Sequence, residues 1–174
     1  MGSCGFHTEN GEWHEIDGRW DLVIAHPPCT YLSNAGACRL YREKGVLDLD
    51  RYVLGLKGKE FFMRFWYYGF YGYGKIVIEN PVPSKVFDLP KHTNCIQPYE
   101  FGDGYSKKTY LWEFGVTPLM PRYMGDKFLP YVSCGTSQNK GNREKAGVSR
   151  AGGASRVRSK TFAGIAEAMA EQWG

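Results

Sequence analysis

The sequence predicts an α/β fold built on a mostly parallel sheet with helices on its faces. Two short runs rich in β-branched residues, 20–25 and 75–79, are each stopped by proline and have the composition of buried strands. Between them, residues 48–71 repeat apolar side chains at helical spacing. A strand, a helix and a second strand in this order form a right-handed crossover, which makes the two strands parallel neighbours.

The first strand is expected to end at a stiff turn that carries a cysteine. Residues 1–19 are polar with scattered glycines, which is compatible with a loop or a short hairpin. The run 20–25 then stops at Pro27-Pro28, and Cys29 follows directly. Because proline fixes its own backbone angle and cannot donate to a sheet ladder, the strand ends here and the thiol lies on a stiff turn.

The middle of the chain is expected to supply the crossover helix and the second strand. Residues 48–71 form one amphipathic helix, and the aromatic cluster of residues 61–73 is expected to be mainly its core face. Glycines end this helix before the strand 75–79, which closes at Asn80-Pro81.

The second half of the chain is expected to hold a third strand, a basic Gly/Ser-rich loop and a final helix. Residues 109–114 alternate in the strand pattern. Residues 134–160 are rich in Gly, Ser, Asn, Lys and Arg, which is typical of a mobile loop. Thr161 is a candidate N-cap for a helix over residues 161–173. Residues 1–174 are expected to form a single domain, because this length is usual for one.

The charge of the chain favours a polyanionic partner such as DNA. The formal net charge is +4, from 22 lysines and arginines against 18 acidic residues. Seven basic residues lie between positions 140 and 160, where Glu144 is the one acidic residue. A solvated loop and a phosphate-contacting loop both explain this run. In the second case the expected phosphate contacts are Arg143, Lys145, Arg150, Arg156 and Arg158.

The cysteine pattern argues against a disulfide scaffold and against a zinc site. The five cysteines are odd in number, and none belongs to a CxxC pair. The four histidines lack ligand spacing, so no metal is expected. No apolar run approaches the roughly 18 residues of a membrane helix, and no signal peptide is apparent. The expected setting is therefore the reducing cytoplasm, with no membrane partner.

Two reactive side chains are expected at one edge of the sheet. Cys29 follows the first strand, and Glu79 ends the second. Because the carboxyl ends of parallel strands meet at one edge, the thiol and the carboxylate would face the same crevice. A thiolate that adds to C6 of cytosine makes C5 nucleophilic, and a carboxylic acid at N3 supports the addition. The plain alternatives are a structural thiol and a carboxylate that caps a helix or pairs with a lysine.

These motifs, taken in order, resemble the cytosine-C5 DNA methyltransferase family. Pro27-Pro28-Cys29 resembles its Pro-Cys catalytic loop, and residues 78–81 resemble its Glu-Asn-Val motif. Residues 105–112 stand where the family has a short Arg-rich motif that holds the cytosine, with lysines in place of arginines. Four segments also resemble a phage and prophage group of methyltransferase-like proteins, namely residues 21–36, 78–81, 97–112 and 159–173.

The resemblance implies a partial Rossmann-like methyltransferase sheet and a DNA substrate, in a bacterial or phage-infected cell. It assigns Cys29 as the nucleophile toward cytosine C6 and Glu79 as its acidic partner. Residues 33–36 would be a loop that closes over a flipped base, or else an ordinary Gly-ended turn. The residues implied to bind the substrate are Pro28, Asn80, Lys107 and Lys108.

The resemblance also implies S-adenosylmethionine as cofactor, although the segment that binds it is not evident. The family begins with a strand and a Gly-rich turn that bind this cofactor, and residues 1–20 contain no such unit. The chain is therefore expected to be a truncated form or one half of a split enzyme. Residues 82–104 and 115–158 would be small substitutes for the target-recognition domain. Since a partial sheet has an exposed edge, a homodimer or a missing N-terminal half is expected as partner.

Two other functions are open on the sequence. A phage-type remnant of this fold would bind DNA or a host defence protein without catalysis, and the loss of the Gly-rich turn favours it. An enzyme on free pyrimidine nucleotides would use the same thiol addition at C6, and the missing target-recognition domain favours that. His26 is expected to serve packing or hydrogen bonding rather than act as a base.

Overall fold

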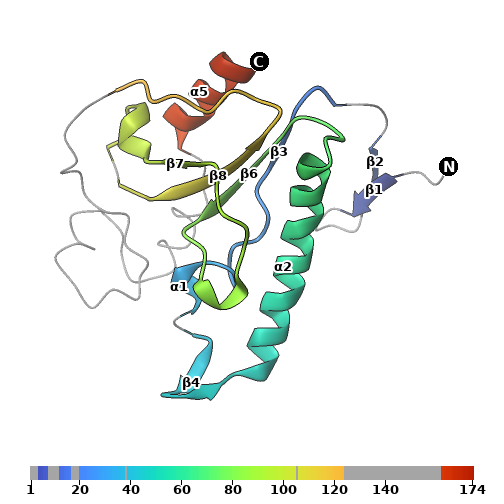
Figure 1. Ribbon diagram of the computed structural model, residues 1–174, viewed down its shortest axis with the longest axis vertical. Coiled ribbons are helices and arrows are strands. Elements are labelled where there is room, and N and C mark those ends of the chain that lie inside the picture. The colour runs from blue at the N-terminus through green and yellow to red at the C-terminus, as the bar shows by residue number, and fades with distance from the viewer. Residues whose placement is uncertain (1–3, 8–11, 17–19, 38, 105, 124–161) are drawn as a thin grey trace.

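The computed structural model describes residues 4–7, 12–16, 20–37, 39–104, 106–123 and 162–174 (Figure 1). Its elements in chain order, with η for a 3-10 helix, are β1 (Cys4–His7), β2 (Trp13–Ile16), β3 (Val23–Ala25), α1 (Asn34–Ala37), β4 (Tyr41–Glu43), β5 (Val46–Leu47), α2 (Leu49–Phe70), β6 (Ile76–Pro81), η1 (Lys85–Phe87), β7 (Asn94–Ile96), η2 (Pro98–Phe101), β8 (Thr109–Phe114) and α5 (Ala163–Trp173). The predicted α/β class is confirmed.

The main sheet has four strands in the order β3-β6-β8-β7. β3 pairs in parallel with β6, whereas β8 lies between β6 and β7 and is antiparallel to both. The prediction of a mostly parallel sheet is therefore wrong, because a single pair of neighbours is parallel. β3, β6 and β7 still run in one direction, and β8 is reversed. The reversal arises because the chain returns from β7 through the 3-10 turn η2, whereas parallel pairing needs a longer crossover.

The strands agree with the sequence pattern to different degrees. β8 has the predicted bounds, and β6 runs on to Pro81 instead of ending at residue 79. β3 begins at Val23 and is therefore shorter than the predicted run 20–25. Trp20, at the start of that run, is 59% exposed. The sequence pattern does not predict β7 or the antiparallel β4–β5 pair, because strands of two or three residues carry no readable alternation. β1 and β2 form a hairpin, which was one of the two expectations for residues 1–19.

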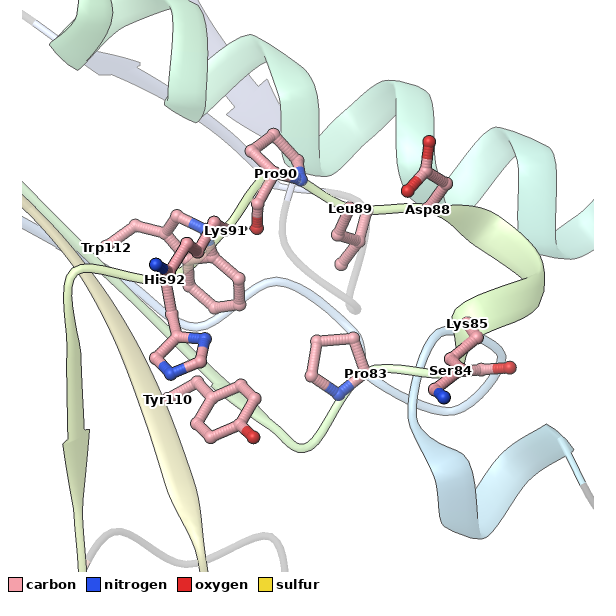
Figure 2. Close-up of a pocket in the computed structure, with 10 residues that line it drawn as sticks. All are labelled: Pro83, Ser84, Lys85, Asp88, Leu89, Pro90, Lys91, His92, Tyr110 and Trp112. Carbon is pink, nitrogen blue, oxygen red and sulfur yellow. Dashed lines mark hydrogen bonds between the residues drawn. The ribbon is translucent and has the colours of Figure 1, made fainter.

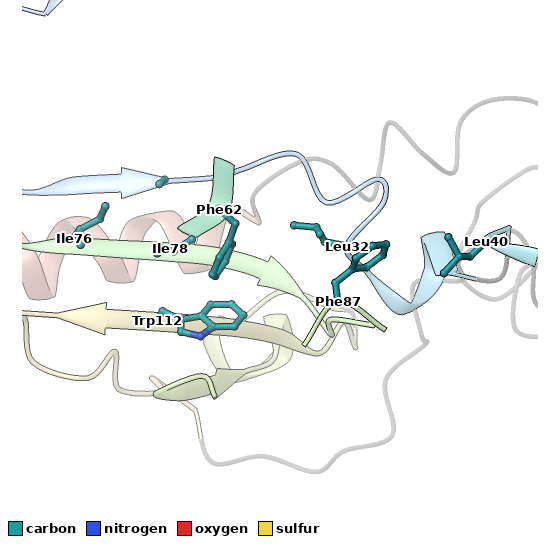
Figure 3. Packing of buried hydrophobic residues seen from close by; sticks show 8 residues of the cluster. Leu32, Leu40, Phe62, Ile76, Ile78, Phe87 and Trp112 are labelled. Carbon is teal, nitrogen blue, oxygen red and sulfur yellow. The ribbon is translucent and has the colours of Figure 1, made fainter. Parts of the chain in front are cut away.

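Two hydrophobic clusters cover the two faces of the main sheet. On one face α2 packs against β6 and β8, where Phe62, Ile78 and Trp112 are fully buried (Figure 3). The Phe62 and Trp112 rings meet edge to face, with centroids 4.9 Å apart. On the other face α5 covers Val77 and Leu111. Helices on both faces therefore support the edge at which β3 and β6 end.

Helix α2 confirms the predicted crossover helix. The Asp48 carboxylate accepts a hydrogen bond from Arg51 N at 3.1 Å and caps its start. Gly72, with a φ of 73°, follows its end. Gly55 lies inside the helix because a Cβ at this position would collide with the Phe87 ring. Close packing against η1 thus accounts for a glycine that helix propensity disfavours.

The aromatic cluster of residues 61–73 is divided between the core and solvent, so the expected core face is confirmed in part: Phe65, Trp66 and Tyr68 pack against the core beside Phe62. Phe62 is buried, but five other rings of the cluster are exposed: Phe61, Tyr67, Phe70, Tyr71 and Tyr73. These rings contact their neighbours instead, as where Trp66 stacks on Phe70 with centroids 4.5 Å apart. Periodicity does not separate the two faces here, because aromatic residues occupy most positions of the stretch.

Helix α5 confirms the predicted C-terminal helix. Phe162 takes the N-cap position, and no side chain caps the helix there. The expected cap, Thr161, and the basic stretch 134–160 lie outside the described residues. No helix within the described ranges combines the length and apolar character needed to span a bilayer.

Candidate functional site

β3 and β6 end side by side at one edge of the sheet, and a polar contact joins the residues there. Ala25 lies opposite Ile78 in the parallel register, so His26 and Glu79 follow as the next pair. His26 Nδ1 lies 3.1 Å from Glu79 Oε2, within hydrogen-bond distance. The two side chains are 42% and 20% exposed, so solvent and ligands reach the contact. His26 therefore has the hydrogen-bonding role expected for it.

The loop that contains Cys29 is anchored at both ends. The His26 contact holds its start, and Ser33 N donates to Cys29 O at 3.0 Å to close the turn. Just beyond, Asn34 N donates to Val82 O at 2.9 Å, which fastens the loop to the segment after β6. The Cys29 thiol is half-buried and lies within this anchored loop. Cys29 therefore lies in the loop that begins at the His26–Glu79 contact, three residues after His26.

Residues 33–36 form a hydrogen-bonded turn that leads into α1. Gly36 N lies 2.9 Å from Ser33 O and 3.3 Å from Ser33 Oγ, and donates to both. A Cβ on Gly36 would collide with the carbonyl oxygen of Thr30, so glycine alone fits there. Residues 33–36 therefore form the Gly-ended turn that was one of the two expectations, and closure of this loop over a base stays a prediction.

Asn80 lies on the opposite face of β6 from Glu79, because successive side chains of a strand alternate. It is fully buried, and within the described residues neither atom of its carboxamide has a hydrogen-bond partner. The β6–β8 register places it opposite Tyr110. Pro28, also predicted to bind substrate, is exposed on the Cys29 loop. The structure therefore groups Pro28 with the thiol and Asn80 with β8.

The two lysines that replace the family's arginines point to different parts of the molecule. Lys107 is buried, and its Nζ lies 5.6 Å from the ring centroid of Phe162 at the start of α5. Lys108 is exposed, and its Nζ lies 5.7 Å from the ring centroid of Tyr110. The expectation that Lys107 or Lys108 steadies the cytosine ring stays a prediction, and this arrangement leaves Lys108 as the exposed one of the two.

Sequence reasoning missed a pocket of about 350 Å³ on the α2 face of the sheet (Figure 2). Residues 83–85 and 88–92 after β6 line it, together with Tyr110 and Trp112 of β8. The His92 and Tyr110 rings stack with centroids 3.6 Å apart. No sequence signal identifies this pocket, because the stacked rings come from separate segments that meet only in the folded sheet.

Burial lowers the pKa of His92, and the nearby charges of Lys108 and Lys91 lower it further. Its imidazole is therefore neutral near pH 7, with one ring nitrogen as donor and the other as acceptor. Burial raises the pKa of the Cys95 thiol on β7, so this cysteine is a protonated thiol at neutral pH.

Some expected features lie beyond what the structure describes. The five expected phosphate contacts, Arg143, Lys145, Arg150, Arg156 and Arg158, fall in the stretch outside the described residues. Within the described ranges, no three His, Cys, Asp or Glu side chains are grouped so as to hold a metal ion. Comparisons with protein-family models, curated proteins and solved structures found no match to this chain.

Proposed function

We propose that this chain is a cytosine-C5 DNA methyltransferase-like protein, with Cys29 as nucleophile and Glu79 as its acidic partner. The observation that supports this function is the parallel β3–β6 pair, which ends both strands at one edge of the sheet. The 3.1 Å contact between His26 and Glu79 ties the start of the Cys29 loop to the carboxylate. A thiol and a carboxylate at one sheet edge are the groups that addition to a pyrimidine ring needs.

In the proposed step, the Cys29 thiolate forms a bond to C6 of cytosine. The C5=C6 π electrons form a new C4=C5 bond, and the electrons of C4=N3 take up a proton at N3 from the Glu79 carboxylic acid. C5 is then the nucleophilic carbon of an enamine. Water protonates C5, and the hydroxide that forms removes the original C5 hydrogen. Expulsion of the thiolate then restores the C5=C6 and C4=N3 bonds as N3 returns its proton to the Glu79 carboxylate, so the C5 hydrogen is exchanged with solvent.

His26 is a positioning residue in this proposal. It contacts Oε2 of Glu79, which leaves Oε1 for the ring nitrogen of the base. A carboxyl group held by one hydrogen bond keeps its orientation at lower entropic cost when the base arrives. His26 does not need to touch the substrate in order to do this.

S-adenosylmethionine, the cofactor that the resemblance implies, finds no fitting site in the described part of the chain. Such a site needs a strand that leads through a Gly-rich turn into a helix. Here β3 leads into Pro27-Pro28, and β6 closes at Pro81 with Pro83 shortly after. We therefore derive no methyl-transfer step. A partner that carries the N-terminal half of the fold would have to supply this site.

A partial Rossmann-like sheet is part of the same proposal. Three strands run in one direction, and α2 and α5 cover opposite faces. Mixed sheets with a reversed strand occur among doubly wound folds, so β8 is compatible with this architecture. β3 is an edge strand of the described sheet, so a partner strand or a second copy of the chain would pair there.

The test is hydrogen exchange at cytosine C5 in heavy water, which requires no methyl donor. The full chain is incubated with duplex DNA, and deuterium in the released nucleosides is measured by mass spectrometry. We expect uptake with the parent chain and only background uptake with Cys29→Ser. Cys95→Ser is the matched control and should exchange like the parent. Uptake that survives Cys29→Ser, or no uptake from the parent chain on any cytosine substrate, contradicts the proposal.

A non-catalytic DNA-binding protein is the second candidate, and the lack of a fitting cofactor site among the described residues favours it. A mobility shift with duplex DNA over a salt series would then show a steep salt dependence, because phosphate contacts release counterions. DNA binding without C5 exchange would identify this function. Exchange on dCMP but not on DNA would instead identify an enzyme of free pyrimidine nucleotides.

A further inference from the structure

The pocket on the α2 face is separate from the edge at which Glu79 lies. Its β8 residues, Tyr110 and Trp112, lie opposite Asn80 and Ile78 in the register. Glu79 alternates to the other face, which α5 covers. The pocket volume of about 350 Å³ falls within the roughly 300–1,000 Å³ of small-ligand sites. The pocket is therefore large enough for a ligand of its own.

The pocket has flat apolar walls. The His92 and Tyr110 rings are 11° from parallel and form one stacked unit. Trp112 stands edge-on to His92, and its Nε1 donates to Pro90 O at 2.9 Å, which fixes the indole. Figure 2 shows Pro83 and the two stacked rings around the same space. Rigid aromatic and proline walls suit a planar heterocycle.

Polar groups at these walls have unused hydrogen-bonding capacity. Among the described residues, no hydrogen bond engages the His92 ring nitrogens or the Tyr110 hydroxyl. A nucleobase carries the matching donors and acceptors on its edge.

Positive charge surrounds the pocket. Lys85 and Lys91 line it and are exposed, and the Nζ of Lys108 lies 5.7 Å from the Tyr110 ring centroid. The acidic lining residue is Asp88, whose carboxylate points away from the stacked rings in Figure 2. Flexible ammonium groups at the rim of an aromatic pocket suit a phosphate.

We propose that this pocket binds a nucleotide, with the base against the His92, Tyr110 and Trp112 walls and the phosphate at Lys85 and Lys91. The nucleotide would be either a free mononucleotide or one unit of a DNA strand, since both present the same base and phosphate. The site goes beyond the proposed function and does not depend on the Cys29 chemistry.

Calorimetric titration of the full chain tests the pocket with probes that divide the nucleotide into its parts. The probes are dCMP, dAMP, deoxycytidine, inorganic phosphate and a short single-stranded oligonucleotide. Each mononucleotide is expected to bind at least about tenfold more tightly than deoxycytidine or phosphate, because both halves of the site then contribute. Equal affinity for phosphate and mononucleotide would overturn the base-binding part of the proposal.

Substitutions then locate the binding site. The double variant Lys85→Ala/Lys91→Ala is expected to weaken dCMP binding about tenfold or more, because both phosphate contacts are lost. Lys44→Ala/Lys57→Ala removes two exposed lysines outside the pocket and should bind like the parent. All four lysines are exposed, so neither variant disturbs the core. Unchanged dCMP binding in Lys85→Ala/Lys91→Ala would overturn the proposal.

Two further comparisons identify the source of the nucleotide and separate this site from the catalytic edge. If the oligonucleotide binds more tightly than dCMP and the double variant weakens both, the nucleotide belongs to a DNA strand. If dCMP binds and the oligonucleotide does not compete with it, the ligand is a free mononucleotide. Cys29→Ser should leave every affinity unchanged, so failure of C5 exchange and failure of this pocket are distinguishable. Absence of mononucleotide and oligonucleotide binding would overturn the proposal.

Discussion

Glu79 and Asn80 are neighbours in the chain but lie on opposite faces of β6. Glu79 contacts His26 at 3.1 Å, whereas Asn80 is fully buried opposite Tyr110. One strand end therefore carries one polar group at the proposed catalytic edge and another that is buried beside β8. Substitutions at the two positions should have separable effects.

Glu79→Gln removes the proton donor at the catalytic edge and keeps the size of the side chain. We expect deuterium uptake at cytosine C5 to fall by about 100-fold or more, the usual contribution of a general acid. Nucleotide binding in the pocket should not change. Glu60→Gln is the control, because this exposed glutamate of α2 pairs only with Arg64 within the described residues. Uptake that stays at the parent level in Glu79→Gln would exclude the assigned role.

Phe62→Ala should destabilise the fold far more than the same change one residue earlier. Phe62 is fully buried against Trp112, so its loss leaves a cavity and should lower the free energy of unfolding by about 3–5 kcal/mol. Phe61 is 43% exposed, and Phe61→Ala should cost about 1 kcal/mol or less. Urea unfolding followed by circular dichroism measures both. Similar losses for the two variants would contradict the packing of α2.

Gly55→Ala and Gly58→Ala should change stability in opposite directions. Alanine in a helix interior is favoured over glycine by about 0.5–1 kcal/mol. At Gly58 the added methyl would meet Leu32 Cγ at 3.6 Å, an ordinary contact, so a rise in the melting temperature is expected. At Gly55 the methyl would collide with the Phe87 ring, so a fall is expected. Thermal unfolding of each variant measures the change in melting temperature. A higher melting temperature in both variants would disprove the close contact between Gly55 and Phe87.

The stability of the chain should depend on pH through His92. Its pKa is lowered below the ordinary 6.5 by burial, then by Lys108 and Lys91, so the unfolded chain binds more protons. The contribution of His92 to stability is therefore complete above about pH 6.5 and is lost as the pH falls toward the folded pKa. His92→Gln should flatten this part of the profile in urea titrations between about pH 5 and pH 8. If the free energy of unfolding of His92→Gln depended on pH as steeply as that of the parent, other groups would be responsible for the pH dependence.

Elements with a repeating pattern can be predicted from this sequence. α2 and β8 have long enough runs for spacing to fix both type and position, and prolines mark the ends of β3 and β6. The relative direction of neighbouring strands carries no such signal, because apolar and polar residues alternate in the same way in parallel and antiparallel strands. The reversal of β8 and the three-residue strand β7 therefore depend on tertiary contacts that the local pattern does not encode.

The candidate site was predictable where chemistry coincides with a strand end. Cys29 comes shortly after one apolar run and Glu79 ends another, and the common edge of the two strand ends follows from the crossover unit alone. The pocket was not predictable, because His92 and Tyr110 belong to different segments and stack only when β8 lies beside β6. The separation of Lys107 from Lys108 has the same cause, since Lys107 lies against Phe162, a residue that only the tertiary fold brings near it.

The place of β8 in the sheet affects how the chain assembles during synthesis. Among the described strands β7 pairs with β8 alone, and β8 is the last of the four strands to leave the ribosome. Until residue 114 has emerged, a nascent chain holds the β3–β6 pair with an unsatisfied edge and β7 without a neighbour in this sheet. Once β8 is complete it pairs with both β6 and β7. Chaperone binding to nascent chains should therefore decline sharply after this point in translation.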